Sequence, residues 1–161
     1  MLHEPDHTVM QEFLPDEPAT QAAGARLAQV LKPGMVMTLS GDLGAGKTTL
    51  TRAILRSMGV NGRIKSPTYS LVEPYVISNL YLYHFDFYRF EDPDEWEASG
   101  FRDCFREDSI CLIEWPEKAA GSLPAPDIAL TLSWVGEGRS LQLNALSKAG
   151  KLCLNQYAQL T

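Results

Sequence analysis

One stretch of the chain decides the fold, and it runs Gly41-Asp42-Leu43-Gly44-Ala45-Gly46-Lys47-Thr48. It satisfies the pattern G-x-x-x-x-G-K-[S/T] at every fixed position. The apolar run 35–40 before it predicts a buried strand, and the run 48–58 after it predicts a helix that Gly59 ends. A strand-to-helix corner of this kind turns backbone N–H groups toward one point, where the helix dipole adds positive charge. The stretch therefore predicts a loop that holds the phosphates of a nucleotide.

The side chains of this loop have separate expected tasks. Lys47 is expected to reach the β and γ phosphates, and the Thr48 hydroxyl is expected to bind Mg²⁺. Thr49, one position along the helix, is a candidate contact to the α phosphate. The simpler alternative is a glycine-rich turn with an incidental lysine. The predicted strand and helix on either side favour the phosphate loop.

Two carboxylates are candidates for the metal and the chemistry. A P-loop site needs an acid that positions Mg²⁺ and a group that orients the attacking nucleophile. Glu114 ends the apolar run 109–114, as a Walker B acid does, and is the expected metal ligand; an ordinary solvated glutamate at a strand end is the alternative. Asp86 also ends an apolar run, and it is a candidate to orient water or to complete the Mg²⁺ shell. Taken alone, the neighbouring His84 and Arg89 are more typical of packing or surface positions.

The segment Ser66-Pro67-Thr68-Tyr69 lies between the predicted phosphate-loop helix and the next strand. GTPase-like folds keep a nucleotide-sensing loop at this place, so Thr68 is a candidate sensor of the γ phosphate. A plain Ser-Pro turn that leads into a strand explains these residues equally well. Tyr69 and Trp115 are expected to be packing residues.

The remaining elements predict an α/β fold. A helix is expected from Asp16 as N-cap, with Pro18 just inside, to Leu31, and strands are expected at 68–76 and 80–88, with Pro74 favouring an edge position for the first. A short helix is expected from Asp92-Pro93 and a helical turn at 101–105. Strands at 127–135 and 139–146 form a predicted hairpin, and the tail 147–160 is either a strand end or a helix. We expect a P-loop NTPase-type, mixed and mostly parallel sheet with helices on both faces and an antiparallel C-terminal hairpin.

Composition limits the class of protein. The chain has 161 residues with a formal net charge of −6, which predicts a single domain over 1–161 and counts against a protein that grips nucleic acid by itself. The start Met1-Leu2-His3-Glu4-Pro5-Asp6 lacks a signal-peptide profile, and no run is apolar enough for a membrane helix. A cytoplasmic location is expected, with Cys104, Cys111 and Cys153 as reduced thiols.

Four motifs in order resemble one family. They are 41–49, the string Lys65-Ser66-Pro67-Thr68-Tyr69-Ser70-Leu71-Val72-Glu73, the string His84-Phe85-Asp86-Phe87-Tyr88-Arg89, and Leu112-Ile113-Glu114-Trp115-Pro116. Together they resemble the bacterial TsaE family of tRNA threonylcarbamoyladenosine (t6A) biosynthesis. The resemblance extends from about Leu14 to the C-terminus. Phe87 is the visible departure in these strings, because family members often have leucine there.

The resemblance implies a slow, Mg²⁺-dependent ATPase that works in a complex with the TsaB and TsaD proteins, which themselves modify the tRNA. It implies Mg²⁺ ligands at Thr48 and Glu114, a catalytic or switch carboxylate at Asp86, and a switch-like threonine at Thr68. Further nucleotide contacts are implied, on looser matches, at Glu17 and Arg139. Contact with tRNA would then be indirect.

Two rival functions share the phosphate loop. A small-molecule kinase needs an acceptor pocket and a lid that carries arginines, and no arginine-rich lid segment is visible in the sequence. A nucleotide-gated adaptor would bind without hydrolysis. Phosphoryl transfer to an acceptor would favour the kinase, and binding without turnover would favour the adaptor.

Overall fold

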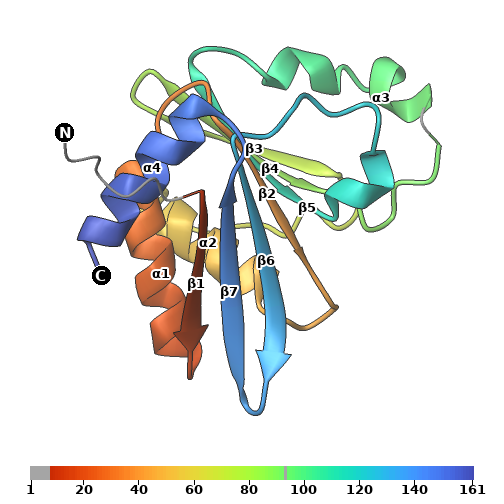
Figure 1. Ribbon diagram of the computed structural model, residues 1–161. Coiled ribbons are helices and arrows are strands. Elements are labelled where there is room, and N and C mark those ends of the chain that lie inside the picture. The colour runs from red at the N-terminus through yellow and green to blue at the C-terminus, as the bar shows by residue number, and fades with distance from the viewer. Residues whose placement is uncertain (1–7, 93) are drawn as a thin grey trace.

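Seven strands form one sheet in the computed structural model, which describes residues 8–92 and 94–161. The strands are β1 Val9–Leu14, β2 Val36–Gly41, β3 Val72–Ile77, β4 Leu80–Asp86, β5 Ser109–Glu114, β6 Ile128–Val135 and β7 Gly138–Ala145. Their order across the sheet is β1-β7-β6-β2-β5-β4-β3 (Figure 1). The four central strands β6, β2, β5 and β4 are parallel, and both sides of the sheet end in antiparallel pairs. The expected α/β class and the C-terminal hairpin are confirmed.

Helices cover both faces of this sheet, as expected, but unequally. The α-helices are α1 Glu17–Val30, α2 Lys47–Met58, α3 Asp94–Ala98 and α4 Lys148–Gln159, and the 3-10 turns are η1 Phe101–Cys104 and η2 Pro116–Ala119. The three long helices pack on one face, over a core that includes Leu27, Leu50, Leu112 and Leu154. The shorter α3, η1 and η2 lie over the other face (Figure 1). None of the described helices is long and apolar enough to cross a membrane.

The position of β5 inside the sheet explains why its sequence is a continuous apolar run. All six of its residues are buried, because side chains from both of its faces meet a covering layer. On one face Ile110 and Leu112 join the core under the long helices, and on the other Cys111 and Ile113 join the aromatic cluster under α3. Alternation along the strand then puts Glu114 on the face that carries α2.

Several boundaries differ from the sequence predictions. Strand β3 begins at Val72 rather than at residue 68, because residues 67–71 form a turn in which the Leu71 N–H donates to the Pro67 carbonyl at 2.8 Å. Strand β4 ends at Asp86, two residues earlier than expected. The edge position predicted from Pro74 is confirmed. Pro93, in the expected start of the short helix, and residues 1–7 lie outside the described residues.

One strand near the N-terminus was not predicted, and the helix near the C-terminus was left undecided by the sequence. Residues 9–14 were expected only as a lead-in, but they form the edge strand β1 beside β7. The undecided tail is the helix α4, which Ser147 caps because its hydroxyl oxygen accepts from the Gly150 N–H at 3.0 Å. The expected N-cap Asp16 is also confirmed, since its Oδ1 accepts from the Ala19 N–H at 2.9 Å.

Candidate functional site

Glycine at two positions allows the corner between β2 and α2. Gly41 has φ 143°, and a Cβ there would lie 2.3 Å from the carbonyl oxygen of Leu132 in the adjacent strand β6. Gly46 is the N-cap of α2 with φ 104°, in the left-handed region that side chains rarely adopt. Only glycine therefore fits the close approach at the start of the loop and the turn at its end.

Lys47 occupies the first turn of α2 and bends back over the loop. Its ammonium donates to the carbonyl oxygens of Gly41 and Asp42, the latter at 3.0 Å, and lies 4.2 Å from the centre of the Trp115 ring. Burial lowers the pKa of Lys47, and the nearby charge of Glu114 opposes that shift. The phosphate loop thus carries a buried cation, the Lys47 ammonium.

Glu114 lies beside the phosphate loop, where β5 pairs with β2 and Leu39 stands opposite Glu114. The Thr48 hydroxyl donates to its Oε1 at 3.0 Å. On its other side, the His84 ring Nε2 lies 2.5 Å from Oε2, and both side chains are almost fully buried, at 1% and 2% exposed. A buried carboxylate needs such partners to remain charged. The alternative of a solvated glutamate at a strand end does not fit this burial.

His84 was missed as a site residue. The sequence carried a signal for it, because strand alternation places His84 and Asp86 on one face of β4. Strand register then brings that face to β5, where Asp86 stands opposite Glu114. The histidine therefore contacts the Glu114 carboxylate and fixes its position, in addition to being buried in the core.

Asp86 is the second carboxylate of the site and is only 8% exposed. Its Oδ1 accepts from the Tyr88 N–H at 2.9 Å. Burial raises the pKa of Asp86, and the neighbouring Glu114 charge raises it further, while the Tyr88 N–H opposes the shift. A carboxyl with a raised pKa holds a proton more readily than an exposed aspartate does, which suits a group that exchanges protons with a bound molecule.

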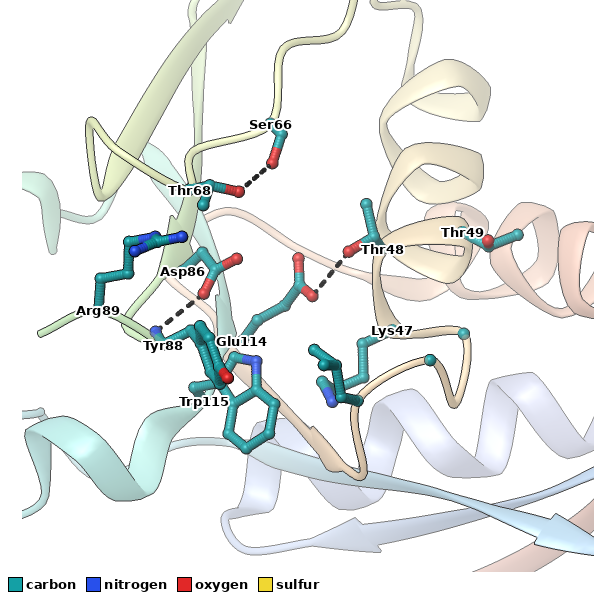
Figure 2. A pocket seen from close by; sticks show the side chains of 13 residues that line it. Lys47, Thr48, Thr49, Ser66, Thr68, Asp86, Tyr88, Arg89, Glu114 and Trp115 are labelled. Carbon is teal, nitrogen blue, oxygen red and sulfur yellow. Dashed lines mark hydrogen bonds between the residues drawn. The ribbon is translucent and has the colours of Figure 1, made fainter.

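These groups open into one pocket of about 360 Å³, within the size range of small-molecule sites (Figure 2). Its lining residues are Leu43, Gly44, Gly46, Lys47, Thr48, Thr49, Ser66, Thr68, Asp86, Tyr88, Arg89, Glu114 and Trp115. Lys47 and Thr48 lie on one wall, and Thr68, Asp86 and Arg89 lie on the wall across from them (Figure 2). The Thr68 hydroxyl is 2.7 Å from that of Ser66. Most of the residues predicted for the site are thus brought together.

Tyr69 is 83% exposed at the surface, so it is not the packing residue that was expected. Trp115 packs against the aromatic cluster, as expected, and it also lines the pocket. Asp42 and Ala45 lie within the loop, and their carbonyls are already bound. The Asp42 carbonyl binds Lys47, and the buried Ala45 presents its carbonyl to the Arg139 Nε–H at 3.1 Å.

A second pocket, of about 180 Å³, adjoins the other side of the phosphate loop. Gly44, Gly46 and Thr49 line both pockets, so the two meet at the loop. Glu17 from α1 and Arg139 from β7 line the second pocket. Neither residue was predicted from the local sequence pattern, because each comes from an element remote from the loop.

The donor atoms of the first pocket fit a magnesium nucleotide. A threonine hydroxyl and a carboxylate are hard oxygen ligands, and Mg²⁺ in nucleotide sites takes few protein ligands beside phosphates and water. The described residues hold no group of three or more histidine, cysteine, aspartate or glutamate side chains that could hold a metal ion. A central parallel sheet, a glycine loop opening a helix and an acid on the next strand define a P-loop protein of the α/β class.

Comparison with known proteins gives the family. The sequence profile of the family described as threonylcarbamoyl adenosine biosynthesis protein TsaE matches residues 14–141. A relative of that name from Haemophilus influenzae is 43% identical over 154 residues, covering 92% of this chain and 98% of its own. One from Bacillus subtilis is 37% identical over 118 residues, 73% of each chain. The crystal structure of YdiB from Bacillus subtilis superimposes with a TM-score of 0.78 at 27% identity, covering 94% of this chain and 95% of its own. The chain belongs to the TsaE family.

Proposed function

We propose that this chain binds Mg-ATP in the first pocket and hydrolyses it slowly as the ATPase component of t6A biosynthesis. It acts through a complex with TsaB and TsaD, and tRNA is held by those partners. The observation that carries this proposal is the Thr48–Glu114 hydrogen bond, because it places a hydroxyl and a buried carboxylate 3.0 Å apart beside the loop. Family membership supports the biological context.

The phosphates are bound by the loop 41–48. Backbone N–H groups at the N-terminus of α2 point to the phosphate oxygens, and the Lys47 ammonium turns from the loop carbonyls to the β and γ phosphates. The nucleoside end extends into the second pocket, toward Glu17 and Arg139. Thr49 lines both pockets and contacts the phosphate nearest the nucleoside.

Thr48 and Glu114 would hold the metal, which leaves Asp86 to orient the attacking water. Mg²⁺, when bound, neutralises charge on the β and γ phosphate oxygens. His84 keeps the Glu114 carboxylate in place from the opposite side. Thr68 lies on the wall opposite the loop and senses the γ phosphate (Figure 2).

Asp86 orients the attacking water and takes up its proton. The water oxygen forms a bond to the γ phosphorus, and the bond from that phosphorus to the β–γ bridging oxygen breaks. The electron pair of the broken bond stays with ADP. Burial beside Glu114 raises the pKa of Asp86, which makes it a better proton acceptor than an exposed aspartate.

The experiment is phosphate release from ATP by the purified chain, alone and with TsaB, TsaD and tRNA. We expect slow release alone and faster release in the complex. Asp86→Asn should keep Mg-nucleotide binding and lose turnover, since the amide has the same shape but accepts no proton. Normal turnover by this variant would refute the assigned role, and phosphoryl transfer to a small acceptor without free phosphate would identify a kinase instead.

A further inference from the structure

We infer that Arg89 is a catalytic arginine, and that its guanidinium contacts the γ phosphoryl group as charge develops during hydrolysis. The inference rests on the proposed ATPase function and adds a residue to it. Among the described residues that line the first pocket, Arg89 is the only arginine and Lys47 the only other cation. A P-loop site uses such an arginine to stabilise the transition state.

The backbone that carries Arg89 is fixed from both sides. Phe87 and Phe90 flank the turn and are buried in the aromatic cluster under α3, with ring centroids 5.2 Å apart. The Phe90 N–H donates to the Phe87 carbonyl at 3.0 Å, and the Phe87 N–H donates to the Glu114 carbonyl at 3.1 Å. Two buried phenylalanines therefore anchor a short turn whose remaining side chains, Tyr88 and Arg89, face the pocket.

The guanidinium itself is held by a ring and has no carboxylate partner. It lies 4.9 Å from the centre of the Tyr69 ring. Within the described residues no ion pair involves Arg89, although Asp86 and Glu114 line the same pocket. Figure 2 shows the guanidinium beside Thr68, facing the wall that carries Thr48. Its donors are thus free to bind an anion that enters between the two walls.

Tyr69 is the positioning residue for Arg89. The turn that carries Tyr69 is tied to the end of β4, because the Asp86 N–H donates to the Leu71 carbonyl at 2.9 Å. The ring is 83% exposed, so it contributes little to the core. Tyr69 is connected to the site through the contact of its ring with the Arg89 guanidinium.

The other stacked arginines lack this placement. Arg26 lies over Tyr157, Arg106 over Tyr81 and Arg139 over Trp134, yet none of the three lines the first pocket. A ring contact alone therefore does not identify a functional arginine. The combination of an anchored turn, a place in the phosphate pocket and the lack of a described acidic partner distinguishes Arg89.

The balance of the step is unchanged by this residue. Water adds to the γ phosphorus, the bond to the bridging oxygen breaks, and ADP leaves with the electron pair, while Asp86 takes the proton. Arg89 neither gains nor loses a proton, because a guanidinium stays charged. Its donors bind the γ phosphoryl oxygens, and they bind most strongly when those oxygens carry the charge of the transition state.

The test compares Arg89→Gln with wild type in turnover and in binding. We expect kcat to fall about 10³-fold, the lower end of the contribution of such an arginine, with the Kd for Mg-ADP unchanged. We also expect loss of tight binding of Mg-ADP with aluminium fluoride, a transition-state mimic, in a titration that needs no turnover. Arg102→Gln, which removes an exposed arginine outside both pockets, should match wild type in all three.

Tyr69 supplies a second, independent variant that does not threaten folding. Tyr69→Ala should lower kcat and weaken the aluminium fluoride complex while the KM for ATP stays constant, and Tyr69→Phe should restore both. Arg89→Gln with wild-type turnover and wild-type binding of the mimic would overturn the inference and leave the proposed ATPase intact. A wild-type chain that binds no Mg-ADP would instead overturn the proposed function itself.

Discussion

Two carboxylates share the site, and at the scale of residues their surroundings separate their roles. Glu114 is held between the Thr48 hydroxyl and the His84 ring, which fixes the position of its carboxylate. Asp86 accepts one backbone N–H, and burial raises its pKa. These different surroundings support the proposed division of roles, with Glu114 at the metal and Asp86 in proton exchange.

The pH dependence of turnover should report Asp86. In the proposed mechanism Asp86 accepts the proton from water, so it must be ionised in the free protein, and burial raises its pKa. The acid limb of kcat/KM should therefore lie above the value of about 3.9 for an unperturbed aspartate. A phosphate-release assay across a pH series measures it, and a limb at or below that value would contradict the assignment.

The raised pKa of Asp86 also means that its ionised form lowers the stability of the folded protein. A folded-state pKa above the unfolded value means that the unfolded chain loses this proton first as pH rises, so the folded state is destabilised above both values. Asp86→Asn removes that cost. We expect the variant to melt at a higher temperature than wild type near neutral pH, and the gap to close toward about pH 3.5.

Thermal melts without nucleotide or Mg²⁺ make this comparison. Glu91→Gln is the matched control, because it removes a carboxylate from an exposed position of the same region. A gap between Asp86→Asn and wild type that widens on acidification would show that burial of Asp86 does not destabilise the fold.

At the scale of elements, α1 and α2 are packed closely enough to require a glycine. A Cβ on Gly24 of α1 would lie 2.5 Å from the Cβ of Ala53 in α2 and 3.2 Å from backbone atoms of that helix. Overpacking by Gly24→Ala should lower the free energy of unfolding by about 1–3 kcal/mol. The higher helix propensity of alanine should return about 1 kcal/mol of this loss.

Urea unfolding of Gly24→Ala, Ala53→Gly and the double variant tests this packing. Removing the Ala53 methyl should make room for the new one, so the double variant should be more stable than the sum of the two single effects predicts. Strict additivity, or a Gly24→Ala variant more stable than wild type, would show that the helices are not in this close contact.

The elements also show what the sequence could predict. The glycine loop, its strand and helix, and the strand that ends in Glu114 follow from local patterns, because β5 is buried on both faces and is therefore continuously apolar. Strand β1 was missed because its burial alternates along an exposed edge and only Leu14 is fully buried. The tail was undecided from its sequence; Ser147, which caps α4, also donates to Asp127 Oδ1 at 2.7 Å, a contact that the local sequence does not show.

The part of the candidate site that lies at the ends of these apolar strands and of the loop helix could be predicted from the sequence. Thr48, Asp86 and Glu114 stand at strand and helix ends, where their side chains were expected to meet. His84 and Arg89 depended on which strands are neighbours and on an aromatic core that anchors a turn. Such long-range information is absent from the local sequence. Glu17 and Arg139 were predicted only from the family resemblance, and both residues line the second pocket.

At the scale of the whole molecule, charge limits the partners. The net charge is −6, although the stretch from Leu43 to Val72 holds five basic residues and no acidic one. We expect the purified chain to bind tRNA weakly at physiological salt, because phosphate contacts need a dense basic surface. A filter-binding assay with tRNA should show binding only when TsaB and TsaD are added.

The basic stretch supplies the control for that assay. Arg52 and Arg56 are exposed on α2, and substituting both with glutamine should leave weak binding unchanged. Tight, salt-sensitive binding of tRNA by the chain alone, abolished in this double variant, would show that α2 contacts RNA directly and would contradict the indirect role.

The most direct measurement is a calorimetric titration of Mg-ATP into wild type, Lys47→Ala and Thr48→Ala. If the corner between β2 and α2 wraps the phosphates, wild type should bind one nucleotide per chain, and both variants should lose most of the affinity. For Thr48→Ala alone, omitting Mg²⁺ should have little further effect. Equal affinity in all three proteins, or no heat of binding in wild type, would contradict the assignment of the phosphate site.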